Sequence, residues 1–172
     1  FNMDPLEYWR DNDSDDRQGI TEIKYIEGLY AFWDEIARRF PDSFRVGCSS
    51  GGRRIDLESI ARFHTNQKSD YWYNNSVDQA SLFALNQYLP SSCVMAPIDR
   101  VDEYTLHSVL PSSANLGWIA DGEEFDTDAA NRLVETYREV RHLLVGACYP
   151  LGEYTRRADA WIGSQYHRDD LG

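Results

Sequence analysis

The apolar run Cys93-Val94-Met95-Ala96-Pro97-Ile98 predicts a strand in the middle of the chain. On its amino-terminal side, apolar residues recur at the spacing of one helix face: Val77, Ala80, Ala84, Leu85 and Tyr88. On its carboxy-terminal side, residues 116–120 (Leu-Gly-Trp-Ile-Ala) predict another strand. A long helix from about Thr127 to Val145 follows, so strands and helices alternate outward from residues 93–98.

The same alternation extends toward the amino terminus. A strongly amphipathic helix carries apolar residues at helical spacing: Ile26, Leu29, Tyr30, Trp33, Ile36, Ala37 and Phe40. Pro41 ends this helix, and residues 44–48 (Phe-Arg-Val-Gly-Cys) predict a short strand. A short helix is expected over about residues 55–63, followed by a polar strand over 64–70. The acidic, turn-rich residues 4–16 are expected to form a loop.

Strands and helices that alternate at this spacing imply right-handed βαβ units and a parallel sheet, so the predicted fold class is α/β. Four strands with interleaved helices in about 150 residues correspond to half of a (β/α)₈ TIM barrel, whose usual length is about 250 residues. A doubly wound open sheet is the alternative. The sequence contains neither a GxGxxG nor a Walker motif that would support nucleotide binding.

Length and composition exclude several classes of protein. The 172 residues suggest one domain, and a hydrophobic content of 42% is sufficient for a packed core. The formal charge of −12 argues against nucleic acid or an anionic membrane as a partner. No apolar run approaches the ~20 residues that span a bilayer, so we expect a soluble chain. Because it begins with Phe1 and not Met, we expect a fragment, whose compartment stays open with the cytoplasm favoured.

Neither a metal nor another cofactor is expected. Cys48, Cys93 and Cys148 are odd in number and lack CxxC spacing, and the histidines show no HxH or HExxH pattern. Asp11, Asp13, Asp15 and Glu22 match acidic positions of an EF-hand, but Asp16 stands where that loop needs glycine. A solvated acidic loop is therefore favoured, with calcium binding as an alternative.

Two loops at predicted strand ends carry candidate functional residues. The first is residues 48–56 (Cys-Ser-Ser-Gly-Gly-Arg-Arg-Ile-Asp), in which two glycines allow close approach of the backbone to a ligand. Its arginines can donate directional hydrogen bonds, and Asp56 can orient one of them. In the second, Asp70 precedes Tyr71-Trp72-Tyr73, a carboxyl and aromatic faces that suit sugar chemistry. Asp99 and Asp121 also end predicted strands and are alternative carboxyls. An ordinary turn and a helix cap are the simpler interpretations.

Residues 48–56 followed by Ser69-Asp70 resemble the signature of the melibiase-type α-galactosidases, glycoside hydrolase family thirty-six and its close relatives. Residues 1–5 (Phe-Asn-Met-Asp-Pro) are similar to the tail of that family's nucleophile motif, and residues 17–30 and 149–151 are also similar. The resemblance covers roughly residues 1–151. It implies that these residues are the carboxy-terminal half of a catalytic (β/α)₈ barrel, with residues 152–172 as a tail leading towards a further domain.

The resemblance implies a retaining exo-α-galactosidase that releases terminal α-linked galactosyl residues from oligosaccharides or glycosides by double displacement. Asp70 would be the general acid/base, about 5–5.5 Å from a nucleophile that falls just before Phe1, outside this chain. Substrate would be bound by Asn2, Cys48, Gly51, Gly52 and Arg54, and Trp72 supplies an aromatic face. A homo-oligomer is compatible with the sequence.

The residues around Asp70 depart from the family pattern. Asn66-Gln67-Lys68 precede the Ser-Asp pair where many relatives have a tryptophan, and Tyr71-Trp72-Tyr73 replace an Asn-Thr-Asp run. The departure is compatible with acid–base chemistry by Asp70 and leaves the exact sugar open. A non-catalytic sugar-binding protein or an inactive glycosidase homologue is the alternative function.

Overall fold

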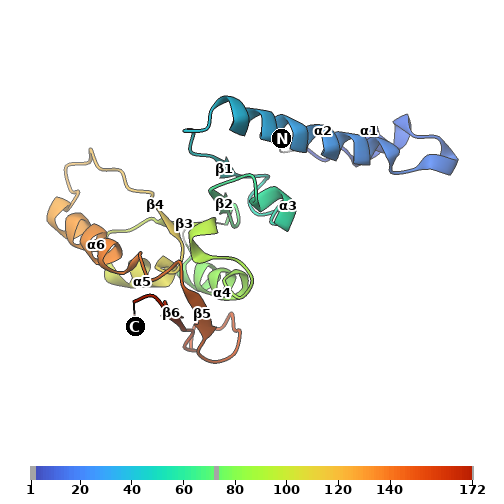
Figure 1. The fold of residues 1–172 in the computed structure, drawn as a ribbon. Helices are drawn as coiled ribbons and strands as arrows, with labels where there is room; N and C mark the ends of the chain where they lie inside the picture. Colours follow the sequence, from blue (N-terminus) through green and yellow to red (C-terminus); the bar gives the residue numbers. More distant parts are fainter. Residues whose placement is uncertain (1–2, 72–73, 172) are drawn as a thin grey trace.

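The computed structural model describes residues 3–71 and 74–171, and a parallel four-stranded sheet lies at its centre. The strands are β1 (Val46–Gly47), β2 (Thr65–Gln67), β3 (Val94–Ile98) and β4 (Ser113–Leu116). They are hydrogen-bonded in the order β1-β2-β3-β4, which is also their order along the chain (Figure 1). The predicted α/β class with a parallel sheet is therefore confirmed.

A helix follows each of these strands, and an Asp or Asn cap directly precedes each of the four helices. The helices are α3 (Leu57–Ile60), α4 (Asn75–Leu85), α5 (Glu103–Val109) and α6 (Thr127–Val140). The side chains of Asp56, Asn74, Asp102 and Asp126 each accept a hydrogen bond from the backbone N–H three residues later. Since the first N–H groups of a helix have no partner within the helix, these caps fix where each strand-to-helix loop ends.

The hydrophobic core lies between β3 and helices α4, α5 and α6. Val94, Ala96 and Ile98 of β3 are almost fully buried. They form one cluster with helix residues that are also buried: Leu82, Leu106, Val109 and Leu133. The apolar pattern of residues 93–98 thus predicted the most buried strand of the sheet, because a strand covered by helices excludes polar side chains.

The fourth strand lies earlier in the chain than the apolar pattern predicts. β4 comprises Ser113–Leu116, and only Leu116 falls within the predicted range 116–120. Met95 to Ile98 pair in register with Ser113 to Leu116, so backbone hydrogen bonds place a segment with two polar residues, Ser113 and Asn115, in the sheet. Ile119 is 80% exposed and belongs to the loop that follows.

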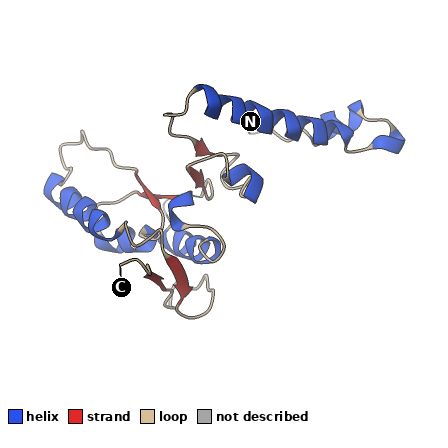
Figure 2. Cartoon of the chain, in the orientation of Figure 1, coloured by secondary structure: helices blue, strands red, loops and turns tan. Residues whose placement is uncertain are grey.

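The amino-terminal segment forms a helical arm that extends away from α4, α5 and α6 (Figures 1 and 2). It consists of α1 (Leu6–Asn12), a 3₁₀ turn over Asp15–Arg17, and α2 (Ile20–Arg39). The expected loop over residues 4–16 is wrong, because Trp9 of α1 packs on Tyr25 of α2 with ring centroids 5.2 Å apart. The predicted amphipathic helix is confirmed, and it begins at Ile20, nearly two turns before the first residue of its apolar pattern, Ile26.

The carboxy-terminal residues add a separate two-stranded antiparallel sheet. β5 (Ala147–Pro150) pairs with β6 (Ser164–His167), from Ala147↔His167 to Pro150↔Ser164. The Tyr166 hydroxyl lies 2.6 Å from Ser91 Oγ and accepts a hydrogen bond from Asn86 Nδ2, so β6 contacts the segment between α4 and β3. The expected boundary at residue 151 lies between these two paired strands and stays a prediction. Within the described part of the chain, no helix has the length and apolarity needed to cross a membrane.

Candidate active site at the ends of β1 and β2

The two predicted functional loops lie against each other. β1 and β2 are parallel neighbours, with Val46 paired to Thr65 and Gly47 to Asn66. Parallel strands end at the same edge of a sheet, so the glycine-containing loop after β1 and residues 68–70 after β2 emerge side by side. This edge is where ligands bind in open and closed parallel α/β folds.

Gly51 and Gly52 form this contact through their backbone. Gly51 has a φ of +76°, and a Cβ atom there would overlap the backbone nitrogen of Asp70 and stand 2.8 Å from Ser69 Cα. A Cβ at Gly52 would overlap the carbonyl oxygen of Lys68. Only glycine permits both the left-handed conformation and this approach, so the two glycines are needed for the loop to reach the Asp70 segment.

A small cavity lies beside this contact, and several predicted substrate-binding residues line it. Cys48, Gly51 and Arg54 are among its walls, together with Gln67 of β2 and Trp33 of α2. Arg54 is half-buried, whereas its neighbour Arg53 is exposed. In the described ranges, no carboxylate lies within ion-pair distance of Arg54. The Arg54 guanidinium therefore stays available for a ligand.

Asp70 is exposed at the edge of the site, and Gln67 holds its carboxyl group. Gln67 Nε2 donates hydrogen bonds to Asp70 Oδ1 at 3.0 Å and to the Ser69 carbonyl oxygen at 3.1 Å. The Ser69 hydroxyl accepts a hydrogen bond from the Tyr71 N–H at 2.8 Å, which fixes the turn after the strand. Sequence reasoning did not single out Gln67. Its position three residues before Asp70 is the only signal that points to it.

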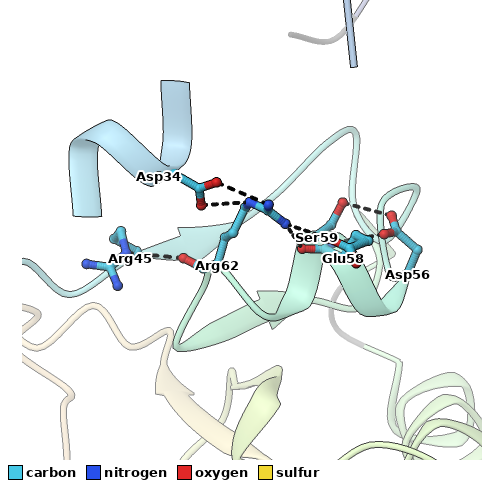
Figure 3. Close-up of polar contacts among 6 residues, drawn as sticks. All are labelled: Asp34, Arg45, Asp56, Glu58, Ser59 and Arg62. Atoms are coloured by element: carbon cyan, nitrogen blue, oxygen red, sulfur yellow. Dashed lines mark hydrogen bonds and ion pairs between the residues drawn. The ribbon is translucent and has the colours of Figure 1, made fainter. Parts of the chain in front are cut away.

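Asp56 does not orient an arginine of the glycine loop, and that prediction is wrong. Its carboxylate accepts hydrogen bonds from the Ser59 N–H and the Ser59 hydroxyl, both at 2.8 Å, as Figure 3 shows. Burial tends to raise the pKa of the Asp56 carboxyl, but these hydrogen bonds outweigh it and leave the pKa lowered. The residue is used as the cap of α3, where an unpaired backbone N–H binds it more directly than a mobile side chain would.

Arg62 joins α2 to the helix that follows the glycine loop. Its guanidinium donates to both carboxylate oxygens of Asp34 at 2.9 and 3.1 Å, and to the Glu58 carboxylate at 3.0 Å (Figure 3). It also lies over the ring of Tyr30, 4.4 Å from the centroid. The Arg62 carbonyl oxygen accepts a hydrogen bond from Arg45 Nε just before β1. These contacts fix both ends of the segment that contains β1 and the loop.

The remaining predicted site residues are placed as follows. Asn2 and Trp72 lie outside the described residues. Asp99 follows β3 and is half-buried, while Asp121 is exposed in the loop between β4 and α6. Among the described residues, the glycines of the loop contact the backbone at Asp70 and not at Asp99 or Asp121, so Asp70 is the carboxyl that the loop supports.

The acidic stretch at residues 11–22 is used to begin α2. Asp13 accepts hydrogen bonds from the Gly19 N–H at 2.7 Å and from the N–H and hydroxyl of Thr21 at 2.9 and 2.6 Å. The Thr21 hydroxyl is the main cause that lowers the pKa of Asp13. Over residues 3–71 and 74–171, no group of three or more His, Cys, Asp or Glu side chains is placed to hold a metal ion.

Curated α-galactosidases are similar in sequence to this chain. It is 27% identical over 165 residues to α-galactosidase AgaA of Geobacillus stearothermophilus. This match covers 86% of this chain and 22% of AgaA. It is 29% identical over 92 residues to α-galactosidase C of Emericella nidulans, covering 53% of this chain and 12% of that protein. The chain thus spans about a fifth or less of the length of these relatives. No protein-family model matches it.

Solved structures of α-galactosidases share the fold. The α-galactosidase of Lactobacillus brevis aligns with 92% of this chain and 23% of its own, at a TM-score of 0.78 and 17% identity. The GH36 α-galactosidase AgaB of Geobacillus stearothermophilus aligns with 82% of this chain and 21% of its own, at a TM-score of 0.62 and 26% identity. A variant of AgaA in complex with raffinose aligns at a TM-score of 0.70 and 24% identity, covering 82% of this chain and 21% of that one.

Over part of its length, the chain is therefore related to glycoside hydrolases. The relationship is to the melibiase-type α-galactosidases, as residues 48–56 and 69–70 indicate.

Proposed function

We propose that this chain is part of the catalytic domain of a retaining exo-α-galactosidase and that Asp70 is its general acid/base. The observation that carries the proposal is the backbone contact of Gly51 and Gly52 with residues 68–70. It joins the two sequence signatures of the related enzymes at one edge of the sheet, beside Arg54 and an exposed carboxyl.

The strand order supports half of a (β/α)₈ barrel over residues 1–151. In a barrel, each strand pairs with the next along the chain, whereas the order reverses within a doubly wound sheet. Here β1, β2, β3 and β4 are neighbours in sequence order, without reversal. The proposed tail, residues 152–172, then leads from the barrel half towards a further domain. The tail contains β6, which pairs with β5.

In the proposed mechanism, Asp70 protonates the leaving oxygen and later removes a proton from the attacking water. Gln67 donates to one carboxylate oxygen of Asp70, and the other, which accepts no hydrogen bond from the described residues, carries the proton. Arg54 and Cys48 contact sugar hydroxyl groups from the cavity wall, and the glycines allow the backbone to lie close to the ring. Asn2, Trp72 and a nucleophile that precedes Phe1 complete the proposed site.

The proposed substrates are oligosaccharides with a terminal α-linked galactosyl residue. The raffinose complex of the related AgaA variant supports this class. Arg54 supports it chemically, because a fixed guanidinium fork discriminates the orientation of ring hydroxyl groups.

The test is an assay of the full-length protein on a panel of nitrophenyl α-glycosides, with the product anomer followed by NMR. The expected result is hydrolysis of the α-galactoside with α-galactose as the first product, because two inversions retain the configuration. A protein that binds α-galactosides in calorimetry and hydrolyses none of the panel would instead be the non-catalytic sugar-binding homologue.

A further inference from the structure

Lys68 and Asp78 form a buried ion pair close in the chain to the proposed acid/base. Lys68 follows β2, two residues before Asp70, and Asp78 lies on α4. Their side chains are 1% and 2% exposed, and Lys68 Nζ contacts Asp78 Oδ1. The other ion pairs in the described part of the chain all contain at least one side chain that is 40% exposed or more.

A pair in this position is costly to bury. Two charges lose their hydration, and an apolar pair of similar volume is often at least as stabilising. Burial raises the pKa of Asp78, the Lys68 ammonium opposes that shift, and the charge of Asp99 adds to it. The Lys68–Asp78 pair therefore adds little to the free energy of unfolding, and its main effect is on the position of the residues that it joins.

The backbone of Lys68 is held on the opposite side. A Cβ at Gly52 would overlap the Lys68 carbonyl oxygen and stand 2.8 Å from its carbonyl carbon. The next residues, Ser69 and Asp70, contact Gly51 in the same way. Residues 68–70 are thus fixed between the glycine loop, through their backbone, and α4, through the Lys68 side chain.

We propose that the buried Lys68–Asp78 ion pair positions Asp70 for proton transfer to the leaving group. This inference rests on the proposed function. The ion pair ties the buried Lys68 side chain to α4, so it limits where the backbone of residues 68–70, and with it the Asp70 carboxyl, can lie. Lys68 and Asp78 are positioning residues, because they act through the backbone of residues 68–70 and do not touch the reacting atoms.

The test compares two substrates in the full-length protein, raffinose and an α-galactoside with an activated nitrophenol leaving group. Lys68→Met is expected to lower kcat/KM for raffinose at least tenfold more than for the nitrophenyl substrate, because an activated phenol needs little protonation. A variant that is only less stable would lose both activities equally. Arg138→Met, which removes an exposed ion pair with Glu135, should change neither.

The double variant Lys68→Met/Asp78→Leu keeps the test valid if the single variant does not fold. An apolar pair is expected to restore the melting temperature and leave raffinose hydrolysis impaired. Recovery of the wild-type substrate ratio in the double variant, or an unchanged ratio in Lys68→Met, would overturn the positioning role alone. A wild-type protein inactive on both substrates would overturn the proposed function, and this inference with it.

Discussion

A Cβ atom at Gly51 would overlap the backbone nitrogen of Asp70, so no side chain fits at residue 51. This contact joins the loop after β1 to the segment after β2. Gly51 and Asp70 are nineteen residues apart in the chain. The glycine-rich loop is thus both a candidate sugar-binding surface and a support for the carboxyl that performs the proposed proton transfer.

Gly51→Ala is expected to destabilise the protein and to lower its activity. The left-handed φ of +76° costs a non-glycine residue about 1–2 kcal/mol, and the overlap with residues 69–70 adds roughly 1–3 kcal/mol. Urea unfolding measures the first effect, and kcat on raffinose measures the displacement of Asp70.

Gly152→Ala is the matched control. Gly152 has a φ of +117° and no atom within 4 Å of its Cβ position among the described residues, so the variant carries backbone strain without overlap. It should lose about 1–2 kcal/mol of stability and no activity. Equal losses in the two variants would show that the contact between residues 51 and 70 has no role of its own.

Asp70→Asn is expected to abolish most activity on substrates with poor leaving groups. An amide cannot donate the acidic proton, so raffinose hydrolysis should fall by two orders of magnitude or more, on the scale of general acid catalysis at about 10²–10⁴-fold. The glycosylation step on an activated nitrophenyl galactoside should fall far less. Equal raffinose activity in mutant and wild type would move the assignment to Asp99 or Asp121.

The parts of the fold that were predictable from sequence are those in which local pattern and tertiary contact agree. Residues 93–98 are apolar because β3 is covered by helices, and the pattern predicted the strand almost to the residue. β4 was misplaced because the register with β3 selects Ser113 to Leu116 through backbone hydrogen bonds, which leave no hydrophobic signal. The apolar residues 117–120 misled the prediction: Trp118 packs against the core from a loop, and the other three are exposed.

The site was predictable only where a motif preserved it. The glycines and Asp70 came from such a motif, and the structure brings them together. The Lys68–Asp78 pair had no such signal, because its members belong to different elements and no local spacing connects them. For Asp56 the motif was misleading. Its position next to two arginines predicted that it would orient one of them, but its carboxylate binds a backbone N–H at the start of α3.

Loss of the Asp56 cap should destabilise α3 in a pH-dependent way. Asp56→Ala is expected to cost about 1 kcal/mol near neutral pH, seen as faster amide exchange at Ser59. The pKa of Asp56 is lowered from 3.8, so its stabilisation is fully present above that value and is lost as the pH falls through the lowered pKa. The exchange difference between wild type and variant should therefore close under acid conditions.

Asp56→Asn provides the control for the charge. Asparagine keeps an oxygen that can accept the Ser59 N–H bond, so this variant should lose only a few tenths of a kcal/mol and show no acid transition of its own. An Asn variant as unstable as the Ala variant would mean that charge and not capping matters at this position.

The isolated residues 1–172 should self-associate. β1 and β4 each have one unpaired edge in the described sheet, and Val46 and Leu116 on these strands are 42% and 51% exposed. Open edges beside exposed apolar side chains pair with other chains. Light scattering after size exclusion should show dimers or larger species. A cooperative melting transition of a monomer would count against the half-barrel.

Arg54→Ala should reduce catalysis and leave the fold intact. Arg54 lines the cavity beside Cys48 and Gly51 without an ion-pair partner in the described ranges, so its removal breaks no ion pair. If its guanidinium contacts sugar hydroxyl groups whose hydrogen bonds strengthen in the transition state, the loss is roughly 2–3 kcal/mol in kcat/KM. We expect at least a tenfold decrease in kcat/KM with a nearly unchanged melting temperature.

Arg53→Ala is the control for Arg54→Ala, because the adjacent arginine is exposed and carries the same charge. It should leave both kcat/KM and the melting temperature unchanged. Equal losses of activity in the two variants would indicate a general effect of positive charge on substrate binding. An Arg54→Ala protein that unfolds, or one that keeps full activity, would make the loop an ordinary turn, since a ligand-binding guanidinium must affect catalysis more than stability.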